Sequence, residues 1–184
     1  MDERKLLILD LDETLIHASQ VPLDRDCDFT IEDFYVYKRP YLREFIEAVN
    51  SFYQIAIWSS GVEYYVLGIV AQLAEEIDPL KFNRLAFLWA RSHCNAMSSD
   101  AAKDGYFLKD LEKVEEAGYE LDNVVIVEDE TRKVHRHYDN AIFIAPFRGD
   151  TADSDLKKLA IYLERLKDKE NIREVEKRFW EREV

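Results

Sequence analysis

Five short apolar segments constrain the fold of this chain more than any other feature. They span residues 6–9, 53–58, 85–90, 124–127 and 141–144. Apolar runs of this length, of which only 53–58 contains a polar residue (Gln54), are typical of parallel strands that are buried on both faces of a sheet. Residues 42–49, 62–77 and 108–117 have apolar side chains at helical spacing and separate successive runs. Strands that alternate with helices predict a doubly wound parallel sheet in a three-layer, Rossmann-like α/β fold.

The C-terminal part of the chain has a different pattern. A stripe that includes Leu156, Leu159, Leu163 and Leu166 predicts one helix after Asp153, and residues 172–180 predict a second. We expect residues 1–152 to form one α/β domain, and residues 153–184 to form helices that pack on the same domain.

The charge of the chain is strongly acidic and unevenly distributed. There are 25 Lys and Arg against 38 Asp and Glu, a formal net charge of −13, and the whole excess lies within residues 1–152. An acidic chain is a poor ligand for duplex nucleic acid, because affinity there comes from basic side chains that neutralise phosphates. No apolar stretch is long enough to cross a membrane, and the two cysteines make no disulfide framework. We therefore expect a cytoplasmic protein, or a nuclear one if the source is eukaryotic.

Polar residues follow several of the apolar runs, where ligands bind in parallel α/β sheets. Asp10 and Asp12 follow the first run, Ser59 and Ser60 the second, and Glu128 and Asp129 the fourth, while Lys109 lies at the start of the third helix. We expect these side chains to converge at one edge of the sheet. Carboxylates brought together repel unless they take up protons or hold a cation, and Mg²⁺ is the cation that such oxygen ligands favour.

This set of residues suits phosphoryl transfer. Asp10 and Asp12 are two residues apart, so their side chains project to the same side of an extended backbone. One carboxylate can attack phosphorus and form an aspartyl-phosphate, and the other can protonate the leaving oxygen and later accept a proton from water. Ser59 and Lys109 can hold the phosphoryl oxygens.

Several motifs resemble one family in order and spacing. Residues 10–15, DLDETL, match the DxDxT signature of the haloacid dehalogenase (HAD) superfamily of phosphotransferases. The longer run DLDETLIHAS, over residues 10–19, resembles the branch of RNA polymerase II C-terminal-domain phosphatases, or NLI-interacting-factor-like phosphatases. Lys38-Arg39-Pro40, residues 105–111 and residues 125–129 are similar to further motifs of that branch. The resemblance covers roughly residues 5–150.

The resemblance implies a role for each matched residue. Asp10 would be the nucleophile and a metal ligand, and Asp12 the general acid/base with its backbone carbonyl on the metal. Lys109 would be the lysine of the third motif, and Asp129 would complete the Mg²⁺ site. Glu128 precedes Asp129 where relatives often have Asp, so either residue could dominate the metal site. The phosphate-binding set would be Thr14, Ser59, Ser60, Lys109 and Arg39, with Ser60 as the alternative to Ser59 and a carboxylate as the alternative partner of Arg39.

The spacing of the motifs bears on the substrate. Thr14 and Ser59 are separated by 44 residues and Ser59 and Lys109 by 49. The predicted strands and helices leave room there only for small flaps: a hairpin that joins 29–31 to 34–37, and a hairpin or loop at 92–104. A HAD-like domain without a large cap has an open site, which can admit a side chain on a protein surface.

We therefore predict a Mg²⁺-dependent phosphatase that acts on phosphoserine or phosphothreonine in a protein or peptide. A small phosphorylated metabolite or a nucleic-acid end is the alternative substrate, and a catalytically weak binding or scaffold module is the alternative class. The chain is expected to be a monomer or a weak oligomer.

Overall fold

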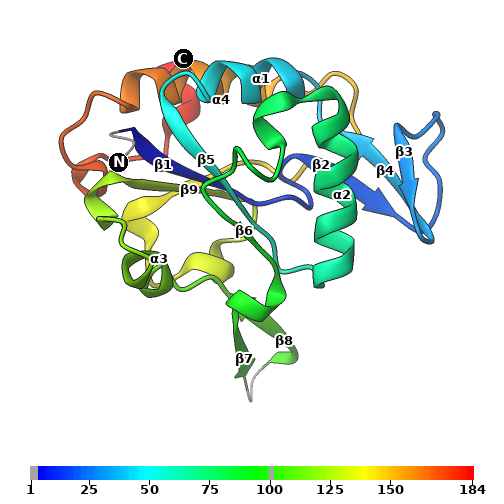
Figure 1. Cartoon of the computed structure of the whole chain (residues 1–184), viewed down its shortest axis with the longest axis horizontal. Coiled ribbons are helices and arrows are strands. Elements are labelled where there is room, and N and C mark those ends of the chain that lie inside the picture. Colours follow the sequence, from blue (N-terminus) through cyan, green and yellow to red (C-terminus); the bar gives the residue numbers. More distant parts are fainter. Residues whose placement is uncertain (1–3, 100–101) are drawn as a thin grey trace.

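The computed structural model describes residues 4–99 and 102–184. Its centre is a five-stranded sheet in the order β10-β9-β1-β5-β6 (Figure 1), and every pairing in it is parallel. The strands are β1 (Lys5–Leu9), β5 (Tyr53–Trp58), β6 (Leu88–Trp89), β9 (Val124–Glu128) and β10 (Ala141–Phe143). Each of the five predicted segments contributes a strand to this sheet, which confirms the α/β fold.

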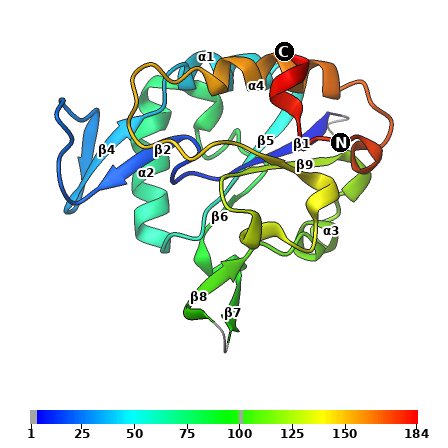
Figure 2. The ribbon, with the colours of Figure 1, turned by 180° about the vertical axis from the view of Figure 1, so that it is seen from behind.

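Helices cover both faces of the sheet, and together they make three layers (Figure 2). One face is covered by α1 (Leu42–Val49), α2 (Glu63–Glu76) and α4 (Asp155–Leu166), and the other by α3 (Glu112–Glu116). In β1, Leu7 and Leu9 pack under α1, α2 and α4, whereas Leu6 and Ile8 pack on the side of α3. Because successive side chains of a strand point to opposite faces, a strand buried on both faces must be continuously apolar.

The order of the strands reverses beside β1. β5 and then β6 follow on one side of β1, while β9 and β10 lie on its other side. Ligand sites of open α/β sheets lie at the carboxyl ends of the strands where such a reversal occurs. The fold therefore brings Asp10, directly after β1, beside Glu128, the last residue of β9.

Two small antiparallel units are inserted in the chain and extend away from the central sheet (Figure 1). β2 (Ile16–Ser19), β4 (Phe34–Lys38) and β3 (Phe29–Ile31) form one sheet in the order β2-β4-β3, and β7 (Asn95–Ser99) pairs with β8 (Ala102–Leu108) in a hairpin. The predicted pairing of 29–31 with 34–37 is confirmed, and β2 adds a third strand to it. Within the described residues there is no large cap domain, as the sequence predicts.

Two predicted elements are shorter than expected. In the segment 85–90 only Leu88–Trp89 forms a strand, although the N–H of Ala86 still donates to the carbonyl of Ile55 at 2.8 Å. The helix predicted over 108–117 begins only at Glu112, because Leu108 ends β8. Lys109 therefore lies in the link between β8 and α3 and not in a helix. Gly118, at φ 96°, follows the end of α3 in the left-handed conformation that favours glycine.

The second C-terminal α-helix was predicted wrongly. In residues 167–184 the chain forms two 3₁₀ helices, η6 (Ile172–Glu174) and η7 (Trp180–Glu183). Ile172 and Trp180 are buried, and the indole N–H of Trp180 donates to the carbonyl of Phe143 in β10 at 2.8 Å. Lys177 Nζ donates to the carbonyls of Ile172 and Val175. The Lys177 ammonium thus engages two carbonyls of this segment that an α-helix would pair with its own N–H groups.

The remaining 3₁₀ helices are single turns in connecting segments. They are η1 (Asp78–Leu80), η2 (Arg91–His93), η3 (Leu121–Asn123), η4 (Thr131–Val134) and η5 (Tyr138–Asn140). Of these, η4 follows the carboxyl end of β9 and therefore borders the candidate site.

Candidate active site

The centre of the site is a buried ion cluster at the carboxyl ends of β1 and β9. Lys109 Nζ lies 2.6 Å from Oδ1 of Asp10 and 2.6 Å from Oε2 of Glu128. All three side chains are between 0% and 1% exposed. Burial would lower the pKa of Lys109, but Asp10 and Glu128 outweigh it and raise that pKa. The ammonium therefore stays charged between the two carboxylates.

A second lysine binds the same carboxylates from another side. Lys133 Nζ, on η4, lies 3.0 Å from Oε1 of Glu128, 3.2 Å from Oδ1 of Asp129 and 3.4 Å from Oδ2 of Asp10. Burial opposes its charge, but these carboxylates raise the pKa of Lys133. The sequence analysis missed this residue. The sequence could have indicated Lys133 as a site residue, because it lies four residues after Asp129 in the loop beyond the carboxyl end of a strand.

Burial raises the pKa of Asp10, and the neighbouring Glu128 raises it further. The two lysines act in the opposite direction without cancelling this effect. Asp10 is thus a buried carboxylate whose charge is offset by neighbouring lysines.

Asp12 is held by two hydroxyl groups. The hydroxyl of Tyr65, in the first turn of α2, donates to Oδ1 at 2.5 Å, and Ser59 Oγ lies 3.5 Å from Oδ2. Burial raises the pKa of Asp12, and the nearby Asp10 carboxylate raises it further. Tyr65 is a second residue that the sequence analysis missed, because its position in a predicted helix gave no sign that its hydroxyl would reach the loop after β1.

The predicted hydroxyl residues occupy different places. Ser59 is buried, and its Oγ accepts the N–H of Gly61 at 2.9 Å besides reaching Asp12. Ser60 is half-buried, and its carbonyl accepts a hydrogen bond from Arg91 Nε at 2.8 Å. Thr14 is fully buried, and its Oγ1 has no hydrogen-bond partner within the described part of the chain.

Arg39 requires a correction. Its side chain is fully buried, and it donates to both carboxylate oxygens of Asp153 at 3.0 and 2.8 Å and to Asp155 at 3.2 Å. Its remaining Nη1 donates to the carbonyl of Thr14 at 3.1 Å. All three of its nitrogens are thus engaged within the protein. Arg39 ties the loop after β1 to the start of α4, so the carboxylate alternative holds and the phosphate-binding assignment does not.

The donor set suits a hard divalent cation. One carboxylate oxygen each from Asp10, Glu128 and Asp129 lie within 4.8 Å of one another. Mg²⁺ favours a few carboxylate oxygens together with water and phosphate oxygens. Both Glu128 and Asp129 reach this cluster, so the structure brings together both candidates that the sequence left open.

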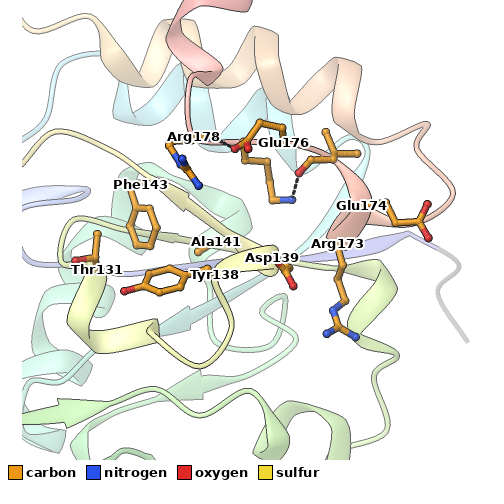
Figure 3. A pocket seen from close by; sticks show the side chains of 11 residues that line it. Thr131, Tyr138, Asp139, Ala141, Phe143, Arg173, Glu174, Glu176 and Arg178 are labelled. Carbon is orange, nitrogen blue, oxygen red and sulfur yellow. Dashed lines mark hydrogen bonds between the residues drawn. The ribbon is translucent and has the colours of Figure 1, made fainter.

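A separate cavity of about 560 Å³ lies beside β10 and not at the ion cluster. Figure 3 shows Tyr138 and Phe143 on one side of it and side chains of the segment 173–178 around it. Thr131 of η4 also lines this cavity, but none of the four carboxylates discussed above does so. The cavity therefore marks the junction between the sheet edge and the C-terminal segment.

The model of the NLI interacting factor-like phosphatase family matches residues 5–173. The chain belongs to this family. CTD nuclear envelope phosphatase 1B of Danio rerio is 30% identical over 188 residues, which cover 94% of this chain and 71% of that protein. CTD small phosphatase-like protein 2 of Dictyostelium discoideum is 31% identical over 91% of this chain and 28% of that protein. Both relatives are named as phosphatases. The chain is a phosphatase, as the sequence predicts.

Solved structures support the fold independently. Fission yeast RNA polymerase II CTD phosphatase Fcp1-R271A, bound to beryllium fluoride, aligns with a TM-score of 0.55 and 18% identity over 90% of this chain and 51% of that chain. This likeness confirms the HAD-type fold. In the described residues no helix of this phosphatase is both long enough and apolar enough to cross a membrane.

Proposed function

We propose that this chain is a Mg²⁺-dependent protein phosphatase that hydrolyses phosphoserine or phosphothreonine through an aspartyl-phosphate on Asp10. The observation that carries the proposal is the position of Asp10 at the strand reversal, with Lys109 on one carboxylate oxygen and Lys133 near the other. A carboxylate beside the buried ammonium of Lys109 is prepared to receive a phosphoryl group whose negative charge that ammonium offsets.

In the first half of the reaction, a carboxylate oxygen of Asp10 forms a bond to phosphorus while the bond from phosphorus to the serine or threonine oxygen breaks. Asp12 gives its proton to that leaving oxygen. Burial raises the pKa of Asp12 and so favours the protonated form that this step needs. Lys109 remains beside Asp10 and stabilises the charge of the transferring group.

In the second half, Asp12 takes a proton from a water molecule as the water oxygen attacks phosphorus. The bond between phosphorus and Asp10 breaks, which restores the Asp10 carboxylate and releases inorganic phosphate. Ser59, Ser60 and Thr14 are the residues proposed to hold or support the phosphoryl oxygens. The contact of Ser59 with Asp12 supports a place for its hydroxyl beside the reacting groups.

Asp10, Glu128 and Asp129 would hold Mg²⁺, together with the backbone carbonyl of Asp12 that the family resemblance implies. When bound, the ion supplies positive charge to the phosphoryl oxygens. The choice of a hard cation is supported by the all-oxygen donor set.

A protein substrate is supported by two observations. The insertions between the motifs are a three-stranded sheet and a hairpin, which leave the described site without a covering domain. Several relatives are named phosphatases of a C-terminal domain, and a protein segment is the substrate class that this name indicates. Three properties stay predictions: residence in the cytoplasm, or in the nucleus if the source is eukaryotic; a monomeric or weakly oligomeric state; and poor binding of duplex nucleic acid.

The test compares substrates and one variant. With Mg²⁺, the chain should hydrolyse phosphoserine or phosphothreonine peptides better than a panel of phosphorylated metabolites and nucleic-acid ends. Asp10→Asn should lower turnover about a thousandfold or more, because it removes the nucleophile. Asp122→Asn is the matched control, since Asp122 is exposed and precedes the amino end of β9. Turnover of metabolites alone would reject the protein substrate, and no turnover with any divalent metal would favour a scaffold.

A further inference from the structure

Lys133 contacts the same three carboxylates that make up the candidate cation site. Its ammonium lies between 3.0 and 3.4 Å from one oxygen each of Asp10, Glu128 and Asp129. These are the residues whose oxygens cluster within 4.8 Å of one another. A cation supplied by the protein thus lies where the proposed function places Mg²⁺.

The two lysines contact different oxygens of Asp10 and Glu128. Lys109 holds Oδ1 of Asp10 and Oε2 of Glu128, and its side chain is fully buried. Lys133 holds Oδ2 of Asp10 and Oε1 of Glu128, and its side chain is 11% exposed. Asp129 also meets Lys133, at 3.2 Å, and its side chain is 5% exposed. A divalent ion that arrives from solvent and binds all three carboxylates must therefore take oxygens that Lys133 holds.

The charges make the two cations alternatives. Asp10, Asp12, Glu128 and Asp129 carry four negative charges when ionised, and Lys109 and Lys133 carry two positive ones. An ammonium and a divalent ion that contact the same carboxylate oxygens lie within a few ångströms of each other and repel strongly in a buried site.

The backbone of Lys133 is fixed while its side chain can move. Its carbonyl accepts the N–H of Lys109 at 2.7 Å, and its own N–H donates to the carbonyl of Glu130 at 3.1 Å. The four-carbon stem of a lysine can swing its ammonium by several ångströms without a change in the backbone.

We infer that Lys133 is a built-in competitor for the metal site, whose ammonium must leave Asp10, Glu128 and Asp129 when a divalent cation binds. The inference rests on the metal site of the proposed function. In the metal-free protein Lys133 offsets the charge of the carboxylates. Because the metal must displace this ammonium, Lys133 lowers the affinity of the site for metal.

The test measures Mg²⁺ binding directly by isothermal titration calorimetry of the full chain. Lys133→Met removes the charge and keeps an unbranched stem, so it should bind Mg²⁺ about tenfold more tightly, a change of about 1.4 kcal/mol. Lys133→Arg keeps the charge and should bind Mg²⁺ no more tightly than the wild type. Lys113→Met is the matched control, because Lys113 donates to the carbonyl of His93 outside the cluster.

A second measurement uses the wild-type chain, in case Lys133→Met folds poorly. NMR of lysine ammonium groups should show a slowly exchanging signal that Lys133→Arg lacks, and Mg²⁺ should abolish its protection. Equal or weaker Mg²⁺ binding by folded Lys133→Met, or a protected signal unchanged by Mg²⁺, overturns the inference alone. If neither the wild type nor the variant binds Mg²⁺, the metal part of the proposed function fails as well.

Discussion

The hydroxyl of Tyr65 lies 2.5 Å from Oδ1 of Asp12 and joins the first turn of α2 to the loop after β1. Ser59 Oγ approaches the other oxygen of the same carboxylate at 3.5 Å. The carboxyl group proposed as the acid is thus held by a residue that directly follows β5 and by a residue of α2. Its orientation depends on the packing of α2 against the sheet.

Tyr65→Phe removes only the hydroxyl. It should slow turnover to an extent that depends on the basicity of the leaving group. Protonation by Asp12 matters most when the leaving oxygen is basic. We expect turnover of a phosphoserine peptide to fall about tenfold, and turnover of 2,4-dinitrophenyl phosphate to stay within about twofold of the wild type. Steady-state kinetics with both substrates give the comparison.

The control for this variant is Tyr64→Phe, because Tyr64 is 61% exposed and precedes Tyr65 in the same helix. An equal loss for both substrates would contradict positioning of Asp12. It would indicate that Tyr65 acts on substrate binding or on the fold.

The sheet could be predicted from the sequence because its strands carry a local signal. Burial on both faces requires uninterrupted apolar runs, and 6–9 and 124–127 are recognisable for that reason alone. The convergence of Asp10 and Glu128 could be predicted because ligand sites of parallel sheets lie at the carboxyl ends of the strands. Lys109 was found through the motif, although β8 and not a helix leads to it.

The remaining parts of the site depend on contacts between distant segments. Lys133 reaches the carboxylates through the conformation of η4, and Tyr65 reaches Asp12 through the docking of α2. No periodicity of residues 131–134 or 63–76 encodes these contacts. The prediction of a second C-terminal α-helix was wrong for the same reason, because packing of Trp180 against β10 outweighs a helical pattern.

Arg39 should be required for stability and not for phosphate binding. Its buried guanidinium pairs with Asp153 and Asp155. Arg39→Met leaves Asp153 without its cationic partner, while Asp155 keeps Lys158 at 3.0 Å, and should lower the free energy of unfolding by about 3 kcal/mol. At temperatures where the variant is folded, its affinity for inorganic phosphate should match that of the wild type.

Urea denaturation and phosphate inhibition measure the two properties of Arg39→Met separately. Arg43→Met is the control, because the Arg43–Glu47 pair is exposed and should contribute little to stability. A large loss of phosphate affinity in folded Arg39→Met would restore the phosphate-binding assignment.

Trp180 tests whether residues 167–184 belong to the same folding unit as the sheet. The indole is 1% exposed and contacts β10 through the carbonyl of Phe143. Trp180→Ala should cost about 3–5 kcal/mol of unfolding free energy, as for other buried aromatic residues. Phe179→Ala, at a side chain that is 48% exposed, should cost far less. Similar small losses in both variants, measured by chemical denaturation, would separate this segment from the domain.

Asp110 should make stability depend on pH. Its side chain is 3% exposed and accepts hydrogen bonds from His137 and Arg136, both at 2.8 Å. Burial acts to raise the pKa of Asp110, but hydrogen bonds from His137, the N–H of Glu112 and Arg136 outweigh it and lower that pKa. The folded state therefore favours the ionised form.

A carboxyl group whose pKa is lower in the folded state stabilises the protein above its unfolded pKa, which is about 3.9. The stabilisation is lost as the pH falls through the folded pKa. Asp110→Asn should therefore cost about 2 kcal/mol at pH 7, and the difference from the wild type should shrink below about pH 4. Urea denaturation between pH 7 and pH 3 measures this difference, with Asp122→Asn as the exposed control. A cost that stays constant over this range would mean that the lost hydrogen-bond acceptor, and not the charge of Asp110, accounts for it.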